Sequence, residues 1–445
     1  MAVPETARAS EAAAGRALRN GDILAGIMRS YLRIVALAFA VVAAGSTELA
    51  AQPCSQPDLS FLVSKVKAVQ SQLLAYKLSD EIDEGVPPPL QSHIRAFKDA
   101  FAELGDAAVK CAHAVIDAKS LEGELAKLLD ANKPAVDEVY DPKKPPQLDH
   151  IYGDFVDVKV TQPSNRPGLL LVDFRFDIAC GFDSLLLGYE FDEGRWKRVL
   201  RWQSGDYDEI KDAFGDFFDY VVLPHKDKRD WLIAVAHGMP WCTSNMSGFK
   251  LDLIRPMDSQ HAEKTLFRRE LEYRRDVDPI MKALPNGFQL RMIGENIDPA
   301  IIMKTVFYRF VLNGDELERV QPVASNGRDF VDEWLQSPWS DAARWSAAEN
   351  LEQLDTMQKH LMADNASMNS DDYPELNYGP VRSCPGSKSH FQVELDEEWV
   401  GPKADPTRKR TLYFQIEEGK NSFTMLSAST RPDPHCTGHD IMPAL

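Results

Sequence analysis

The densest group of potentially catalytic side chains lies in the acidic stretch GDYDEIKDAFGDFFDY, residues 205–220. Within it, Asp212, Asp216 and Asp219 are spaced by four and three residues, so a helix would place them on one face, where like charges repel. A Ca²⁺ ion could neutralise them, and paired carboxylates are also what glycoside hydrolysis requires. We favour the plainer interpretation, a solvated face of an acidic protein, and expect no cofactor other than this candidate calcium.

A histidine and a cysteine lie close together in HGMPWCTSNMSGF, residues 237–249. A thiolate beside an imidazolium would be an activated nucleophile. However, Trp241 precedes Cys242, whereas papain-like enzymes have tryptophan after the cysteine, and Cys242 has an evident role in a disulfide. We therefore favour a structural role for this stretch.

The segment HCTGHD near the end of the chain spaces His435, Cys436, His439 and Asp440 as metal ligands could be spaced. A disulfide at Cys436 would remove its thiolate, and terminal segments are often poorly ordered. We therefore favour the interpretation without a metal.

Tryptophans supply the candidate ligand-binding residues. Trp334, Trp339 and Trp345 flank a predicted helical segment, and exposed tryptophans could stack on sugar rings; Trp241 would lie on the same ligand face. Tryptophan usually serves the core or an interface, because its ring buries a large apolar area. The core interpretation is favoured, and an exposed aromatic platform is the alternative.

Familiar catalytic motifs are missing from the sequence. It contains no G-x-S-x-G elbow, dinucleotide-binding G-x-G-x-x-G, Walker A loop, H-E-x-x-H or EF-hand spacing. This argues against several enzyme classes, although not against hydrolases whose catalytic residues lie far apart in the sequence.

The elements that position these residues begin after an apparent leader, MRSYLRIVALAFAVVAAG at residues 28–45. Its apolar run, Ile34–Ala44, is shorter than the roughly 20 residues that a membrane-spanning helix needs. Arginines before the run and small residues after it complete a secretory signal. We predict translation from Met28, cleavage near Ala51, and a secreted or periplasmic protein without a stable membrane span; an uncleaved anchor and a buried helix are the alternatives.

The cysteine content agrees with export. Six cysteines follow the leader and none form a C-x-x-C pair, which in an exported chain indicates disulfides. We predict pairing of nearest neighbours in the sequence, with free buried thiols as the alternative. The predicted pairs are Cys54–Cys111, Cys180–Cys242 and Cys384–Cys436.

The net charge of −18 argues against nucleic acid and anionic membranes as partners, because a phosphate-binding protein needs a basic face. The expected partner is an unidentified protein or glycan.

Residues 54–132 are predicted to form a helical hairpin domain. Asp58 could cap a first helix with apolar residues at spacings of three and four, and a second helix follows the turn EGVPPP, residues 84–89. Such a pair cannot bury both apolar stripes alone, so it must dock on the rest of the chain or on a second copy as a homodimer. Residues 133–150 are predicted to be a linker.

Residues 151–445 are predicted to form a mainly antiparallel β domain of repeated meanders, propeller-like or a sandwich. Alternating apolar runs recur around glycine turns at Gly194, Gly314 and Gly419, since tight hairpin turns need positive φ. A fourth, less regular unit covers residues 219–256, and coincidence among ordinary hairpins is the alternative. A helical insertion at 328–363 and a loop at 364–389 interrupt the pattern, with Pro338 separating two helices of which Ser340 or Asp341 starts the second.

The sequence therefore predicts an α+β protein, exported and held by disulfides. The leading functional hypothesis is an extracytoplasmic binding or interaction protein without catalytic activity, because no coherent catalytic set is evident. The alternative is a secreted hydrolase of glycan or peptide that uses carboxylates of residues 206–219.

Overall fold

The structure is a computed structural model. It describes residues 56–76, 86, 88–111, 116–133, 152–178, 181–204, 217–224, 230–238, 246–256, 263–275, 277–301, 303–365, 373–402 and 409–442. Several predicted features lie outside these residues: the signal peptide, most of the linker, Trp241, the acidic residues up to Asp216, Cys54, Cys180 and Cys242. Among the described residues, no helix combines the length and apolar character needed to cross a membrane.

The N-terminal helical region has three helices rather than the predicted two. They are α2 (Gln56–Leu74), α3 (Pro88–Cys111) and α4 (Ala118–Leu129). Since α2 begins at Gln56, Asp58 lies inside the first turn and is not the cap that the sequence predicted. The third helix begins at the N-cap Asp117, whose side chain accepts a hydrogen bond from the Lys119 backbone.

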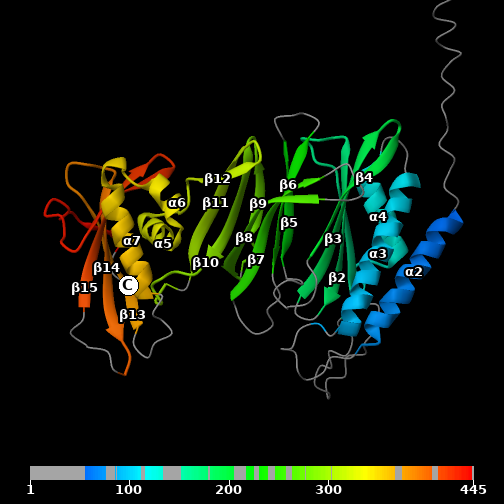
Figure 1. Cartoon of the computed structure of the whole chain (residues 1–445), viewed down its shortest axis with the longest axis horizontal. Coiled ribbons are helices and arrows are strands. Elements are labelled where there is room, and N and C mark those ends of the chain that lie inside the picture. The colour runs from blue at the N-terminus through cyan, green and yellow to red at the C-terminus, as the bar shows by residue number, and fades with distance from the viewer. Residues whose placement is uncertain are drawn as a thin grey trace, which may run out of the picture. The chain divides into compact units, whose positions relative to one another are not determined.

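The predicted antiparallel meanders with helical insertions are confirmed, and they form four sheets (Figure 1). Sheet A contains β1 (Val156–Thr161), β2 (Leu169–Ile178), β3 (Gly181–Asp192) and β4 (Arg195–Gln203). Sheet B contains β5 (Phe218–Pro224), β6 (Trp231–Gly238), β7 (Met246–Pro256) and β8 (Glu263–Arg274). Sheet C contains β9 (Ile280–Leu284), β10 (Gly287–Gly294), β11 (Lys304–Asn313) and β12 (Glu316–Val320). Sheet D contains β13 (Tyr373–Ser383), β14 (His390–Val400), β15 (Lys409–Gly419), β16 (Ser422–Ser429) and β17 (Asp440–Met442).

Sheets A, B and C each add one strand to the predicted three-strand meander, namely β1, β8 and β9, and sheet D adds two, β13 and β17. Strand β13 falls in a segment that the sequence predicted to be a loop, because it contains Pro374, Gly379 and Pro380. The pairing of β13 with β14 shifts register between Tyr378 and Val381, so the Gly-Pro pair sits in an irregularity where proline is tolerated.

Two of the three predicted glycine turns have the expected backbone. Gly194 and Gly314 have φ of +80° and +66°, in the region that side chains rarely adopt. Gly419 does not have positive φ; it ends β15 opposite Ser422, and the turn falls on the next two residues.

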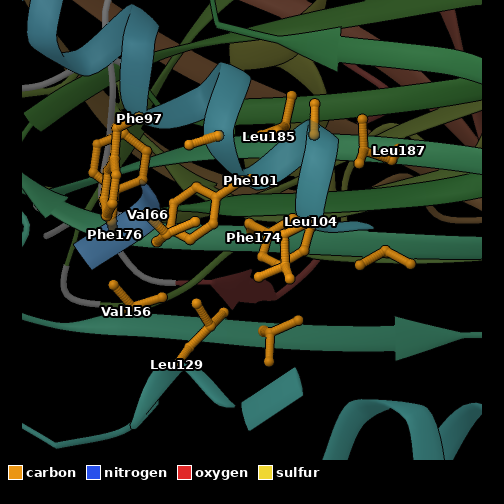
Figure 2. Packing of buried hydrophobic residues seen from close by; sticks show 14 of the residues in the cluster. Val66, Phe97, Phe101, Leu104, Leu129, Val156, Phe174, Phe176, Leu185 and Leu187 are labelled. Carbon is orange, nitrogen blue, oxygen red and sulfur yellow. The ribbon is translucent and has the colours of Figure 1, made fainter. Parts of the chain in front are cut away.

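The helices α2 to α4 dock on one face of sheet A, which is one of the two arrangements considered for the predicted hairpin. Alternate residues of β1 and β2, including Val156, Phe174 and Phe176, share one apolar cluster with Phe97 and Phe101 of α3 (Figure 2). The buried Lys98 ammonium also lies 2.7 Å from a carboxylate oxygen of Asp183 on β3. The hairpin stripe is thus covered within the chain, while the predicted homodimer stays a prediction.

Neighbouring sheets also pack through apolar faces. Leu171 and Leu186 of sheet A share a cluster with Ile233 of sheet B, and Leu251 of sheet B shares another with Phe288 of sheet C. Because sheets A and B are covered on both faces, parts of β2 and β6 are continuous apolar runs and do not alternate with polar residues.

The insertion between sheets C and D contains more elements than predicted. They are α5 (Gly327–Gln336), α6 (Trp339–Ala342), η3 (Ala343–Trp345), η4 (Ala348–Asn350) and α7 (Leu351–Asn365). Pro338 does separate two helices, but the second is a single turn, and the long helix begins only at Leu351. Helices α5 and α7 share an apolar cluster with sheet D.

One predicted disulfide falls on described residues and is confirmed. Cys384, which follows β13, is bonded to Cys436, 52 residues later. The Cys54–Cys111 and Cys180–Cys242 pairs stay predictions, because the side chains they require lie outside the described residues.

Candidate active site

A row of polar side chains lies on the face of sheet A opposite the helices. The apolar residues of β1 and β2 that contact the helices alternate with Asp157 and Lys159 on β1, and with Asp173, Arg175 and Asp177 on β2. Because Cα partners in an antiparallel pair share a face, these five residues point to the same side of the sheet. We call this set the β1–β2 polar row.

Register places two carboxylates of the row close together. Asp157 lies opposite Arg175, and Asp177 is two residues further along β2. Diagonal neighbours of this kind have Cα atoms about 7–8 Å apart. The two carboxyl groups therefore lie near each other on one face of the sheet, as required of the two carboxyl groups that flank the glycosidic bond in a glycosidase.

The Asp177 carboxyl has the environment of a general acid. Burial, together with the nearby Asp154 carboxylate, raises the pKa of Asp177 to about 6, and a hydrogen bond from the Phe155 backbone offsets only part of this rise. The side chain is nevertheless half-buried rather than enclosed. A carboxyl group that stays protonated near pH 6 and remains accessible can donate a proton to a leaving group.

Asp173 is the fully buried member of the row. Burial raises the pKa of Asp173 to about 6, although Arg175 acts in the opposite direction. One carboxylate oxygen accepts a hydrogen bond from Arg175 Nε at 2.9 Å, whereas the other, Oδ1, has no hydrogen-bond partner among the described side chains. Asp173 therefore holds Arg175 in place but is too enclosed to contact a substrate.

Arg175 connects the row to sheet B. Its guanidinium donates a hydrogen bond to the Phe218 carbonyl at 3.1 Å and lies over the Phe182 and Phe218 rings, at 5.2 and 5.3 Å from their centroids. Two aromatic faces, a carboxylate and a carbonyl fix the guanidinium, so Arg175 is a rigid cation beside Asp157.

Asp219 is the one residue of the predicted calcium set that the structure describes. Its carboxylate accepts hydrogen bonds from the backbone of Tyr220, at 2.8 Å, and of Met281 on β9, at 3.3 Å. Burial raises the pKa of Asp219, while both hydrogen bonds act to lower it. Within the described part of the chain, no group of three or more His, Cys, Asp and Glu residues is arranged to hold a metal ion. A calcium site at Asp212 and Asp216 stays a prediction, because both lie outside that part.

The predicted tryptophan platform is largely buried. Trp334 and Trp345 are 0% and 3% exposed and belong to the cluster beneath sheet D, while Trp339 is half-buried against it. The indole N–H of Trp334 donates to Ser346 Oγ at 2.9 Å, which satisfies its polar group in the core. A ligand face built from these residues and Trp241 stays an untested prediction that this burial disfavours.

The last two candidates from the sequence, His237 and the segment 435–440, lie in surroundings that suit structural roles. His237 is buried beside Trp202, and burial lowers the pKa of His237 to about 4, so the ring is neutral. Near the end of the chain, Cys436 is in the disulfide and Asp440 contacts Arg382 Nε at 3.1 Å. Neither observation favours a metal at residues 435–440.

Comparison with known proteins gives no family and a weak structural likeness. No family model and no curated protein matches the chain. Among solved structures, the α-L-arabinanase of Penicillium chrysogenum with bound arabinobiose has 10% identity and a TM-score of 0.24, over 63% of this chain and 67% of the enzyme. The α-L-arabinofuranosidase of Fusarium graminearum with an iminosugar inhibitor has 7% identity and a TM-score of 0.25, over 60% of this chain and 64% of the enzyme. The Fusarium enzyme with arabinobiose has 8% identity and a TM-score of 0.26, again over 60% of this chain and 64% of the enzyme.

The proteins named are an arabinanase and an arabinofuranosidase, so they give no support to the prediction of a binding protein without catalytic activity. TM-scores near 0.25 assign neither a shared fold nor a substrate, and only the geometry of this chain can identify catalytic residues.

Proposed function

We propose that the chain is a glycan hydrolase with its active site on the β1–β2 polar row. The observation that carries the proposal is the diagonal pair of carboxylates, Asp157 and Asp177, on one face of sheet A. Asp177 is the general acid, because its pKa is raised to about 6. Asp157 is the second carboxylate and lies opposite the fixed guanidinium of Arg175.

The proposed reaction is a single displacement. Asp177 gives its proton to the glycosidic oxygen as the bond from that oxygen to the anomeric carbon breaks. Asp157 takes a proton from the water that attacks the anomeric carbon from the opposite side. Because the reaction is a single displacement, we expect inversion at the anomeric centre.

The test is hydrolysis of arabinohexaose, cellohexaose and chitohexaose by the purified protein, with reducing ends measured. Asp177→Asn should lower kcat by about 10²- to 10⁴-fold, because proton donation is lost. Asp157→Asn should do the same, whereas the matched control Asp192→Asn, on the exposed β3–β4 hairpin, should leave kcat unchanged. Full activity of both site variants would refute the assignment, and no hydrolysis of any glycan in a wider screen would refute the function.

The pH profile supplies a second test. Since the general acid must be protonated, kcat/KM should fall about tenfold per pH unit above pH 6. The fall should be absent from the residual activity of Asp177→Asn. A profile with no limb near pH 6 would remove Asp177 from this role.

We also propose that the protein is exported. The proposal is supported by the leader-like segment at residues 28–45 and by the Cys384–Cys436 disulfide, which forms in oxidising compartments. N-terminal sequencing of the mature protein should begin near residue 52. Recovery of the uncut chain from the cytosol would refute export.

A further inference from the structure

Phe155 is an exposed aromatic residue beside the proposed catalytic pair. Its side chain is 41% exposed, and its backbone carbonyl accepts a hydrogen bond from the Asp177 backbone at 3.0 Å. Phe155 immediately precedes β1, and this hydrogen bond continues the β1–β2 pairing, so Phe155 stands opposite Asp177. Side-chain alternation then puts Phe155 on the side of sheet A that carries the polar row.

The aromatic residue on the other side of Asp177 is different. Phe182 is the Cα partner of Asp177 on β3, but its ring is covered by the Arg175 guanidinium and packs at the edge of the core between sheets A and B. In the described part of the chain, no aromatic ring and no cation lies against Phe155. Of the two rings that flank the general acid, only Phe155 can offer a face to a ligand.

Exposure of a single phenylalanine needs no explanation by itself. The position of Phe155 is informative, because an apolar surface next to carboxyl groups suits a ligand that has both polar and apolar parts. Sugar rings are such molecules: their C–H faces pack on aromatic rings while their hydroxyls bond to carboxylates.

We propose that Phe155 binds substrate by stacking on the glycan ring next to the bond that is cleaved. This inference rests on the proposed function and adds a binding residue to it. Stacking fixes the plane of one sugar ring, and thereby directs the glycosidic oxygen toward Asp177.

The experiment measures glycan binding and turnover separately. In an Asp177→Asn background, calorimetry with arabinohexaose, cellohexaose and chitohexaose gives Kd without hydrolysis. Adding Phe155→Ala should raise Kd about tenfold for the glycan that binds, and Phe155→Trp should restore it to within threefold. In the otherwise wild-type protein, Phe155→Ala should raise KM more than it lowers kcat. The control is Phe61→Ala, since Phe61 is 71% exposed on α2, away from the row, and should change neither value.

The outcomes separate this inference from the proposed function. If the wild-type protein cleaves a glycan and Phe155→Ala binds it as tightly as before, the stacking role is refuted and the function stands. If Phe155→Trp fails to restore binding while melting temperatures are unchanged, Phe155 acts through the backbone and not through its ring, which also refutes the proposal. If no glycan binds or is cleaved, the function itself falls.

Discussion

Two charged clusters of this protein differ in their balance of charge. Between sheet C and α5, Glu333 lies 2.6 Å from Arg319 and 3.4 Å from Lys304, and Lys304 also contacts Asp332. On sheet A, the β1–β2 polar row contains three carboxylates and two cations, whereas the first cluster contains two of each. Among the described residues, one buried atom of each cluster has no hydrogen-bond partner, Arg319 Nε in the first and Asp173 Oδ1 in the second.

The ionisation of the acids differs only in part. Burial alone would raise the pKa of Glu333, but Arg319 and Lys304 hold it below its ordinary value, whereas burial still raises the pKa of Asp332 in the same cluster to about 6. In the row, burial raises the pKa of both Asp173 and Asp177 to about 6. A raised pKa is therefore found in both clusters. Exposure distinguishes them, because Asp332 is fully buried whereas Asp177 of the row is half-buried and can reach a ligand.

Removing a charge from the paired cluster should have the largest effect on stability. Glu333→Ala leaves Arg319 buried without its carboxylate, so we expect the free energy of unfolding to fall by about 3–5 kcal/mol. Urea denaturation measures it, with the exposed Glu318→Ala as the control, which should lose less than about 1 kcal/mol. A small loss for Glu333→Ala would erase the contrast between the clusters.

Removing a charge from the row should increase the free energy of unfolding at pH 7 and not decrease it. The folded-state pKa of Asp173, about 6, lies above its unfolded value, so the folded state holds more protons between pH 4 and 6 and stability falls as pH rises through this window. Asp173→Asn removes this loss, and we expect it to be more stable than wild type at pH 7 by up to about 3 kcal/mol. Denaturation at pH 4, 5, 6 and 7 measures the slope; identical slopes in both proteins would contradict the raised pKa.

The contribution of His237 to stability should change with pH in the direction opposite to that of Asp173. Its folded-state pKa, about 4, lies below the unfolded value, so the folded state holds fewer protons and stability falls as pH drops from about 6.5 to 4. His237→Phe should therefore gain about 2 kcal/mol relative to wild type on going from pH 7 to pH 5. Asp173→Asn serves as the control. If the stability difference from wild type changed with pH in the same direction for both variants, the pKa shift of Asp173 or of His237 would be wrong.

Removing an exposed ion pair should have the smallest effect on stability. Lys65 of α2 contacts Glu103 of α3 at 2.7 Å, with both side chains more than 40% exposed. Water screens such pairs, so Lys65→Ala should cost less than about 1 kcal/mol in thermal or urea unfolding. A loss as large as that of Glu333→Ala would mean that burial does not distinguish the clusters.

Much of the β structure could be predicted from local sequence. Hairpins around Gly194 and Gly314 were predicted correctly, because alternation of apolar residues and the need for positive φ are both local properties. Strand β13 was missed for the same reason, since its Gly and Pro residues resemble a loop until the neighbouring strand β14 is considered. The Cys384–Cys436 bond was predicted from the order of cysteines alone.

The candidate site was predicted less well. The sequence favours residues 206–219 because their acids are dense, and of these acids the structure describes only Asp219. The charges of Lys159 and Arg175 in the row act to lower the pKa of Asp219. The better signal was the alternation in VDVKVT and LLLVDFRFDI, where charged residues occupy every second position of strands that are otherwise apolar. Such polar positions on a sheet face that is partly buried mark candidate chemistry.

The sequence by itself determined which residues of each strand share a face, because side chains alternate along any extended backbone. Only the tertiary structure decided that β1 and β2 pair in the register that sets Asp157 diagonal to Asp177, and that helices cover one face of sheet A and leave Phe155 exposed on the other. Strand register depends on contacts between residues that are far apart in the chain, and a shift by one residue would turn every side chain of the row to the opposite face.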